Sequence, residues 1–330
     1  MKTVGMPRGL FYYYYYPWYK TFFNDLGARV ILSSPTTRIT VDQGINMAVD
    51  ETCFPIKVYF GHVQELCQYD LDYLFVPRIV SVEARSYICP KFMGVPDMIR
   101  ASFSDLPPLI DITIDISRSP RDFQEELYKT GRLFTKSRRR IKAAYEHGRE
   151  ELKYCQAIAA QGYTMAEAID IWEGQEEKGS WNSDLCIGVL GHGYSLYDQT
   201  ISLDIIGRLR KMGCRVLLPE ALPGERVEEE ASTMPKRIFW TLGRKMVGSA
   251  FIMEKKPEID GIIYVACFAC GPDSFIGEII ERKIENKPYM LLVIDEHTGE
   301  GGLNTRLEAF CDMLRRKRRQ KIEDNLPAYG

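Results

Sequence analysis

The sequence predicts an α/β protein with two similar lobes, each a doubly wound parallel sheet, joined by a helical segment. Short apolar stretches typical of strands alternate with helical stretches, which is the pattern of a parallel sheet covered by helices. This pattern breaks off in the middle of the chain and returns afterwards. The spacing of the first two strands also repeats, because Val4 and Val30 lie almost as far apart as Val189 and Val216 do in the second half. We therefore expect a structural duplication.

The first lobe is expected over residues 1–118 and opens with a strand at Thr3–Met6. A helix is predicted over Trp18–Leu26, where large apolar residues recur at helical spacing and Gly27 supplies a stop signal. Further strands are expected at Arg29–Leu32, Asp72–Val76 and Leu109–Ile116.

The remaining two segments are a helical connection over residues 119–183 and a second lobe over 184–330. Charged and apolar residues alternate at helical spacing up to Ile171, which predicts two helices, and the polar stretch Gly174–Asp184 is typical of a linker. In the second lobe a helix is predicted over Leu203–Met212. Strands are predicted at Cys186–Leu190, Arg215–Leu218, Asp260–Val265 and Tyr289–Asp295. The matching order of elements predicts a flavodoxin-like strand order, or a relative of it, in each lobe.

Composition and charge exclude several classes of protein. The chain has 330 residues, 45% hydrophobic and 27% charged, which is the usual mixture of soluble globular proteins and enough for about two domains. A net charge of −2 gives no overall attraction to nucleic acid or to an anionic membrane. No apolar run approaches the ~20 residues of a membrane span, and the first residues lack the features of a signal peptide. We expect a cytoplasmic protein without a nucleic-acid or membrane partner.

The cysteines are the most informative residues. Nine are present, an odd number, and a reducing cytoplasm disfavours disulfides. Buried thiols, metal ligands and redox thiols are the remaining roles, and core packing is the ordinary one. The nine are Cys53, Cys67, Cys89, Cys155, Cys186, Cys214, Cys267, Cys270 and Cys311.

Three of these cysteines lie where an α/β protein places its chemistry. Cys89 and Cys270 lie beyond equivalent strands of the two lobes, and Cys53 lies in a turn that leads into a helix. Each has a proline or glycine close behind it, which indicates a turn. Sites in open α/β sheets form at the carboxyl ends of the strands. Thiols on such turns can converge on one object, and we select these three as candidate metal ligands.

The residues alone leave open what these thiols bind, if they bind a metal at all. Cys267 and Cys270 form a C-x-x-C, but thioredoxin-type pairs open a helix after the first strand of their unit. A structural zinc site needs two close pairs of ligands, and the four histidines are scattered. Single cysteines on separate loops suit an iron–sulfur cluster, whose usual ligands are thiolates. Redox or structural thiols are an equally serious alternative.

Other motifs have simpler explanations. The turn at Gly191-His192-Gly193 could cradle an anion, but a tight strand-to-helix turn accounts for it. The polar loop that follows Asp295 needs no ligand. The basic run that begins at Arg315 is expected to be a solvated helix end. No P-loop and no dinucleotide fingerprint is present, so nucleotide hydrolysis by this chain is not expected.

Several motifs carry a resemblance to a known family. The chain resembles the activase-associated branch of the 2-hydroxyacyl-CoA dehydratase and benzoyl-CoA reductase superfamily, which also includes the double-cubane-cluster proteins. The resemblance runs from the first residues to Phe310 and is most specific where Cys-Phe-Pro-x-Lys and Cys-Gly-Pro-Asp-Ser occur together. The matching segments begin at Val4, Glu51, Gly61, Phe75, Cys89, Gly191, Cys270, Asp295 and Thr305.

This resemblance implies a 4Fe-4S cluster between the lobes, with ligands that map onto Cys53, Cys89 and Cys270. It also implies a separate ATP-dependent activase of the sugar-kinase/Hsp70/actin fold, which delivers a low-potential electron for the reduction or dehydration of a small substrate. A second dehydratase-like subunit or a homodimer is a further implied partner.

The resemblance leaves three matters open. An 8Fe-9S double cubane would need about six cysteines if each cubane takes three. A non-catalytic electron-transfer or cluster-carrier subunit is a second alternative. No catalytic residue, and no set of residues for a CoA thioester, can be assigned from the sequence.

Overall fold

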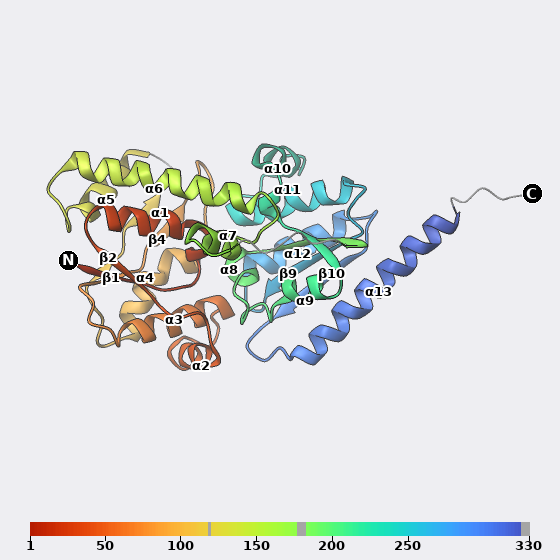
Figure 1. Cartoon of the computed structure of the whole chain (residues 1–330), viewed down its shortest axis with the longest axis horizontal. Helices are drawn as coiled ribbons and strands as arrows, with labels where there is room; N and C mark the ends of the chain where they lie inside the picture. The colour runs from red at the N-terminus through yellow and green to blue at the C-terminus, as the bar shows by residue number, and fades with distance from the viewer. Residues whose placement is uncertain (118–119, 177–182, 325–330) are drawn as a thin grey trace, which may run out of the picture.

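The computed structural model of the chain describes residues 1–117, 120–176 and 183–324. Its centre consists of two four-stranded parallel sheets (Figure 1), with the orders β2-β1-β3-β5 and β10-β9-β7-β8. A two-stranded parallel sheet, β4-β6, extends the first lobe. The strands are β1 (Thr3–Met6), β2 (Arg29–Leu32), β3 (Tyr73–Phe75), β4 (Arg78–Ser81), β5 (Leu109–Ile110), β6 (Thr113–Asp115), β7 (Leu185–Gly191), β8 (Cys214–Leu217), β9 (Gly261–Cys267) and β10 (Tyr289–Ile294).

The predicted α/β class with parallel sheets is confirmed. If the strands of each four-stranded sheet are numbered along the chain, both sheets have the order second, first, third, fourth. This is the beginning of a flavodoxin-like order, and it places the first and third strands side by side at the point where the order reverses. In the second lobe these strands are β7 and β9, which are buried along their whole length.

Helices flank the sheets and link the lobes. Thirteen α-helices and one 3₁₀ turn, η1 (Pro219–Ala221), occur among the described residues. The α-helices are α1 (Tyr12–Asp25), α2 (Arg38–Met47), α3 (Phe54–Leu66), α4 (Pro90–Ser102), α5 (Pro120–Gly131), α6 (Arg138–Ala159), α7 (Met165–Trp172), α8 (Gly193–Leu196), α9 (Ile205–Lys211), α10 (Gly224–Ala231), α11 (Thr241–Lys255), α12 (Gly271–Lys283) and α13 (Glu300–Asp324).

Two sequence predictions about the elements are wrong in detail. The segment Leu109–Ile116 is not one strand, because it divides into β5 in the main sheet and β6 in the small one. The polar Asp111 interrupts the run, and its side chain accepts a hydrogen bond from Arg100 instead of continuing the strand. The connection between the lobes contains three helices, α5 to α7, where two were predicted. The third begins at a capping box between Thr164 and Glu167.

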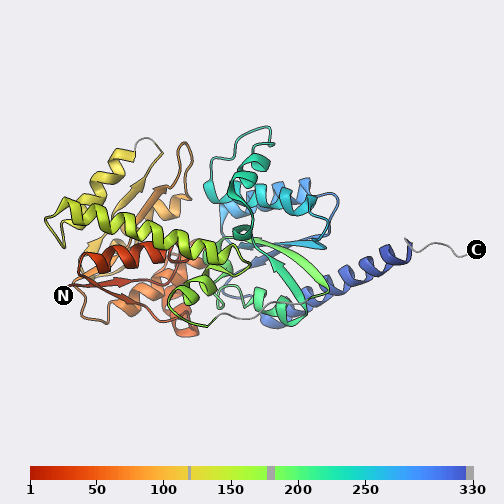
Figure 2. The same cartoon turned by 45° about the horizontal axis from the view of Figure 1, so that its top comes forward.

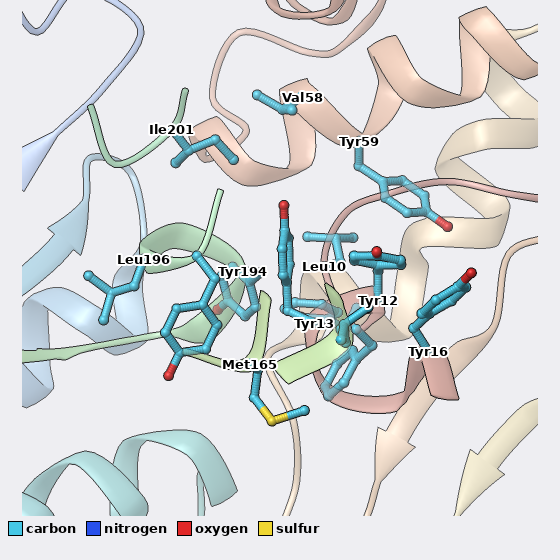
Figure 3. Packing of buried hydrophobic residues seen from close by; sticks show 14 of the residues in the cluster. Leu10, Tyr12, Tyr13, Tyr16, Val58, Tyr59, Met165, Tyr194, Leu196 and Ile201 are labelled. Carbon is cyan, nitrogen blue, oxygen red and sulfur yellow. The ribbon is translucent and has the colours of Figure 1, made fainter. Parts of the chain in front are cut away.

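The first helix starts earlier than predicted. It begins at Tyr12 and contains Pro17, although an interior proline costs about 3 kcal/mol through the lost backbone hydrogen bond. Burial of the large rings of Tyr12, Tyr13 and Tyr16 outweighs that cost. Figure 3 shows these rings packed together with Tyr194 and other residues of the cluster.

The two lobes share one hydrophobic core. A single cluster of buried side chains joins the first sheet, α1 and α3 to β7, α8 and the start of α13. The linking helix α6 lies along α1 in both cartoon views (Figures 1 and 2), and Gly148 of α6 leaves room for Trp18. A second cluster fills the space among β9, α11 and α12. The lobes therefore form one packed body.

The last helix, α13, packs against the second lobe along its first half. Leu303, Leu307 and Leu314 are buried, whereas Arg316, Lys317 and Arg319 are exposed. Arg315 and Arg318 donate hydrogen bonds to the carbonyls of Met212 and Asp184. Figure 2 shows the helix extending away from the second sheet. The predicted solvated helix end is confirmed for Arg316, Lys317 and Arg319, whereas Arg315 is half-buried and bonded to the second lobe. Among the described residues, no helix combines the length and the hydrophobicity that crossing a membrane requires.

Candidate functional site

Each of the three candidate ligands caps the N-terminus of a helix. Cys53 precedes α3, Cys89 precedes α4 and Cys270 precedes α12. A proline follows in the first or second helical position in all three helices. Proline suits these positions because its ring fixes the helical φ and it has no amide hydrogen to leave unpaired. The predicted turn positions are therefore confirmed, and each thiol lies at the positive end of a helix dipole.

The structure brings these three thiols from two lobes into one neighbourhood. Burial raises the pKa of the Cys270 thiol, and the charges of Asp273, Cys53 and Cys89 raise it further. Burial raises the pKa of Cys53 to about 11; the Ile56 amide and the Lys91 charge oppose this, and the charges of Cys89 and Asp273 add to it. These mutual effects are Coulombic and weaken with distance, so the three thiols lie near one another.

All three thiols are therefore protonated at neutral pH in the free protein. Burial also raises the pKa of Cys89, although amide hydrogens at the start of α4 and the Lys91 ammonium partly oppose it. A metal that binds here must displace these protons, since the thiolate is the ligand form. Among the described residues, no three His, Cys, Asp or Glu side chains are arranged to hold a single metal ion. A 4Fe-4S cubane needs a different arrangement, because each of its cysteines binds a different iron and the thiols need not converge on one ion.

Contacts between the lobes lie next to both thiols of the first lobe. Two residues before Cys89, Tyr87 forms a parallel β-bridge to Trp240. The Tyr87 amide donates a hydrogen bond to the Phe239 carbonyl at 2.8 Å, and its own carbonyl accepts one from the Thr241 amide at 3.0 Å. The loop that carries Cys89 is attached by these bonds to the start of α11, in the second lobe.

A buried ion pair lies one helical turn after Cys53. The Lys57 ammonium is 2.5 Å from Glu296, which follows β10 in the second lobe. Burial raises the pKa of Glu296, but the hydrogen bond and charge of Lys57, with a backbone hydrogen bond and the charge of His297, together outweigh it, and the resulting pKa lies below the ordinary value. The lysine of the Cys-Phe-Pro-x-Lys motif therefore joins the two lobes.

The remaining cysteines have packing roles, with one exception. Cys155, Cys186, Cys214 and Cys311 are buried in helices and strands, and the sulfurs of Cys214 and Cys311 are 3.6 Å apart where α13 packs on β8. Cys67 caps the opposite end of α3 from Cys53. The exception is Cys267, which ends β9, two residues beyond the predicted end of this strand. Its thiol donates a hydrogen bond to Ser195 at 3.2 Å, and charges on Asp273 and Cys53 reach it.

The turn that follows β7 contains a buried pair that sequence reasoning missed. The Nε2 atom of His192 is 2.8 Å from Asp273, and only 3% of His192 and 1% of Asp273 are exposed. The hydroxyl of Tyr264 donates to the same carboxylate at 2.9 Å. The Cys-Gly-Pro-Asp motif contains the aspartate, but nothing in the sequence links it to a histidine so far away along the chain.

The same turn has the tight geometry that the sequence predicted. At Gly191 φ is +154°, and an added Cβ would lie 2.8 Å from the Val265 carbonyl oxygen, so only glycine fits. The Gly193 amide donates to the Tyr14 hydroxyl at 2.7 Å. A tyrosine therefore already occupies a donor that an anion would need.

A cavity of about 1000 Å³ opens beside this site, between α6, η1, α10 and α11. Tyr14 lies in its wall, and the ring of Tyr14 packs against that of Tyr194 with the centroids 6.3 Å apart. Buried Arg244 also lines it and forms ion pairs with Glu83 of the first lobe and Glu228 of α10. The carboxylates of the wall outnumber its cations: Glu83, Glu220, Glu225 and Glu228 face Arg244 and Lys245.

Comparison with known proteins identifies the family. No curated protein matches the chain. Residues 3–222 match the family described as the CoA enzyme activase uncharacterised domain (DUF2229). This range contains the first lobe, the linking helices and the second lobe as far as η1, and so includes Cys53, Cys89 and His192 but not Cys270. The chain belongs to the family of the CoA enzyme activase uncharacterised domain.

Proposed function

We propose that this protein holds a 4Fe-4S cluster between its lobes and accepts a low-potential electron from a separate ATP-dependent activase. The electron then serves the reduction or dehydration of a small substrate. The observation that carries the proposal is the convergence of Cys53, Cys89 and Cys270 from three helix N-termini. Membership of a family named for CoA-enzyme activation supports the link to an activase.

The donor set fits such a group. When bound, the cluster would supply one-electron chemistry at low potential. Cys53, Cys89 and Cys270 would hold three of its irons as thiolates. The dipoles of α3, α4 and α12 would stabilise the negative charge of those thiolates. The ion pair of Lys57 with Glu296 and the bridge from Tyr87 to Trp240 would keep the first lobe's ligands opposite Cys270.

A single cubane agrees better with the packing than a double cubane does. A double cubane would need about six cysteines. In the described part of the chain only Cys267 lies near the three candidates, because the others are placed in the core or at the far end of α3. A second dehydratase-like subunit, or a second copy of this chain, would have to supply the missing ligands.

The cavity beside the site does not suit a CoA thioester. Its wall has more carboxylates than cations, and Arg244 is already paired with two of them. The phosphates of CoA would be repelled by such a wall. The proposal therefore assigns no CoA-binding role to this cavity.

The test is anaerobic purification followed by iron and sulfide analysis and electron paramagnetic resonance. The expected result is a brown protein with roughly four irons and four sulfides per chain. A folded protein that stays colourless and iron-free after anaerobic reconstitution would overturn the proposal. One zinc per chain would favour a structural site instead. Oxidation of the reduced cluster by candidate substrates, with activase, ATP and reductant present, separates a reductase from an electron carrier.

A further inference from the structure

The imidazole of His192 lies at the edge of the second sheet where Cys270 caps α12. His192 follows β7, and Asp273 lies in the first turn of α12, the helix that Cys270 caps. Because β7 and β9 are neighbours in a parallel sheet, the residues that follow them meet at one edge of the sheet. The charge of Asp273 adds to burial in raising the pKa of Cys53, Cys89 and Cys270. The pair therefore lies at the sheet edge where Cys270 caps α12, and the charge of Asp273 also acts on the two thiols of the first lobe.

The contact with Asp273 fixes the tautomer of this histidine. Burial raises the pKa of Asp273, but His192 and the hydroxyl of Tyr264 outweigh that effect, and the group remains a carboxylate. A carboxylate accepts hydrogen bonds only, so the Nε2 atom of His192 carries the hydrogen. In a neutral imidazole the Nδ1 atom then carries a free lone pair.

That nitrogen, Nδ1 of His192, is buried and makes no hydrogen bond to the described residues. An unpaired buried polar atom costs about 1–3 kcal/mol, so such atoms in native proteins require an explanation. The aromatic ring of Tyr194, with its centroid 5.1 Å from that of the imidazole, offers no hydrogen-bonding partner of comparable strength.

We propose that Nδ1 of His192 is the fourth protein ligand of the cluster and binds the iron that has no cysteine. This inference rests on the proposed function. The nitrogen lone pair forms the bond in place of a water molecule, and any proton on Nδ1 leaves to solvent as the iron binds. A carboxylate that accepts the other N–H is the usual support of a metal-bound histidine. Asp273 has that position here.

Such a ligand changes what the protein can do at rest. With three cysteines and one histidine, no iron is open, and the protein transfers electrons without binding a substrate on the metal. A substrate that reacts at the cluster must first displace the imidazole.

The test needs the holoprotein, labelled with ¹⁵N-histidine, and pulsed electron paramagnetic resonance of its reduced cluster. The expected wild-type spectrum contains a directly bonded histidine nitrogen that changes with the label. His192→Gln should lose this coupling and keep most of the iron. Glutamine can still donate to Asp273 through its terminal amide. A shift in the midpoint potential should accompany the loss.

His62→Gln is the matched control. His62 is equally buried, also has an unpartnered Nδ1, and is bonded through Nε2 to Thr36, away from the three thiols. This variant should retain the nitrogen coupling. A wild-type cluster without a bonded histidine nitrogen, or a coupling that survives in His192→Gln, would overturn this inference and leave the proposed function intact. A wild-type protein without any cluster would overturn the proposed function itself.

Discussion

Proline follows the three candidate ligands within two positions, and this separates them from the other cysteines. Pro55, Pro90 and Pro272 each allow a helix to begin directly after the thiol. Cys155 and Cys311 have no such neighbour and lie inside helices with their thiols in the core. A side chain that caps a helix lies at its N-terminal end, where it can meet a group from another element.

The residue-level prediction concerns iron content. Each of three alanine variants should lose most of the iron that the wild-type protein binds, because each removes one thiolate from the proposed cluster: Cys53→Ala, Cys89→Ala and Cys270→Ala. The measurement is iron and sulfide per folded chain after anaerobic purification. Cys267→Ala should keep the iron but shift the spectrum of the cluster, because the Cys267 thiol bonds to Ser195 and lies beside the ligands.

Three matched controls should keep the iron, because their thiols are buried away from the strand ends: Cys155→Ala, Cys214→Ala and Cys311→Ala. If Cys267→Ala loses the iron while Cys270→Ala retains it, the assignment of ligands is incorrect.

A pH dependence follows from the raised pKa values. The pKa of Cys53 is about 11, and those of Cys89 and Cys270 are also raised, so protons compete with iron for these thiols throughout the neutral range. Iron affinity should therefore fall as the pH falls. The fraction of iron that an excess of chelator removes should increase from about pH 8 to about pH 6, since each ligand must regain a proton. Removal that is independent of pH in this interval would contradict protonated free thiols.

The sequence allowed the three turn cysteines to be located, because a proline and a strand end are both local signals. Their role as ligands remains a prediction. The pair of His192 and Asp273 could not be located in this way, since β7 and β9 become neighbours only in the folded sheet. Lys57 and Glu296 were seen in two separate motifs, and only the structure joins them.

At the scale of elements, α2 and α3 pack with their backbones in contact. A Cβ added at Gly44 would lie 1.9 Å from the Lys57 carbonyl oxygen, and one added at Gly61 would lie 1.9 Å from the Thr40 carbonyl oxygen. Neither carbonyl can move without distorting its helix. The crossing holds α3, and with it Cys53, at a fixed distance from α2.

Gly61→Ala should therefore lower the free energy of unfolding by about 2 kcal/mol or more, because the overlap with Thr40 forces the helices apart. Gly94→Ala is the control. Gly94 lies within α4, where the nearest atom to an added Cβ is the Met98 sulfur at 4.0 Å. This change should be neutral or stabilise by up to about 1 kcal/mol. Denaturant unfolding measures both, and equal effects of the two variants would refute the close crossing.

The long helices and apolar strands were predictable from periodicity, and their ends were less so. β1 and β2 have the predicted bounds. The start of α1 could not be predicted, since Pro17 is a local signal against a helix and only tertiary burial of Tyr12 and Tyr13 overrides it. The division of the last strand of the first lobe likewise depends on β4, which pairs with β6.

At the scale of the whole molecule, polar contacts add to the shared core between the lobes. The hydroxyl of Thr200 donates to the Thr36 carbonyl at 2.8 Å, and buried Asp198 accepts from the hydroxyls of Thr36 and Tyr13. With the Lys57 ion pair, these contacts join the lobes on the side where α3 begins. The lobes should behave as one cooperative unit.

Lys57→Met tests this junction. The change leaves Glu296 buried without its partner and should lower the free energy of unfolding by about 3 kcal/mol. Iron content should fall as well, because Cys53 would no longer be held against the second lobe. The double variant with Glu296→Gln should recover part of the stability. Arg282→Ala, which breaks an exposed pair with Glu278, should change it by less than about 0.5 kcal/mol. If Lys57→Met and Arg282→Ala lowered the free energy of unfolding by similar amounts, Lys57 would have no special role at this junction.

The isolated chain should neither bind ATP tightly nor hydrolyse it. The sequence has no P-loop and no dinucleotide fingerprint, and the Gly193 amide, which could donate to a phosphate, is bonded to Tyr14. Calorimetry with purified protein should show no micromolar binding. ATP turnover that persists through removal of contaminating ATPases would assign the activase role to this chain itself.

The division of the thiols between the lobes also orders events during protein synthesis. Cys53 and Cys89 leave the ribosome with the first lobe, and Cys270 follows on the order of 10 to 40 s later at typical bacterial and eukaryotic elongation rates of ~5–20 residues per second. During that interval the nascent first lobe carries two ligands of an incomplete site. The proposed cluster can be inserted only after the second lobe has been translated, so a scaffold that delivers it must recognise the finished chain and not the nascent one.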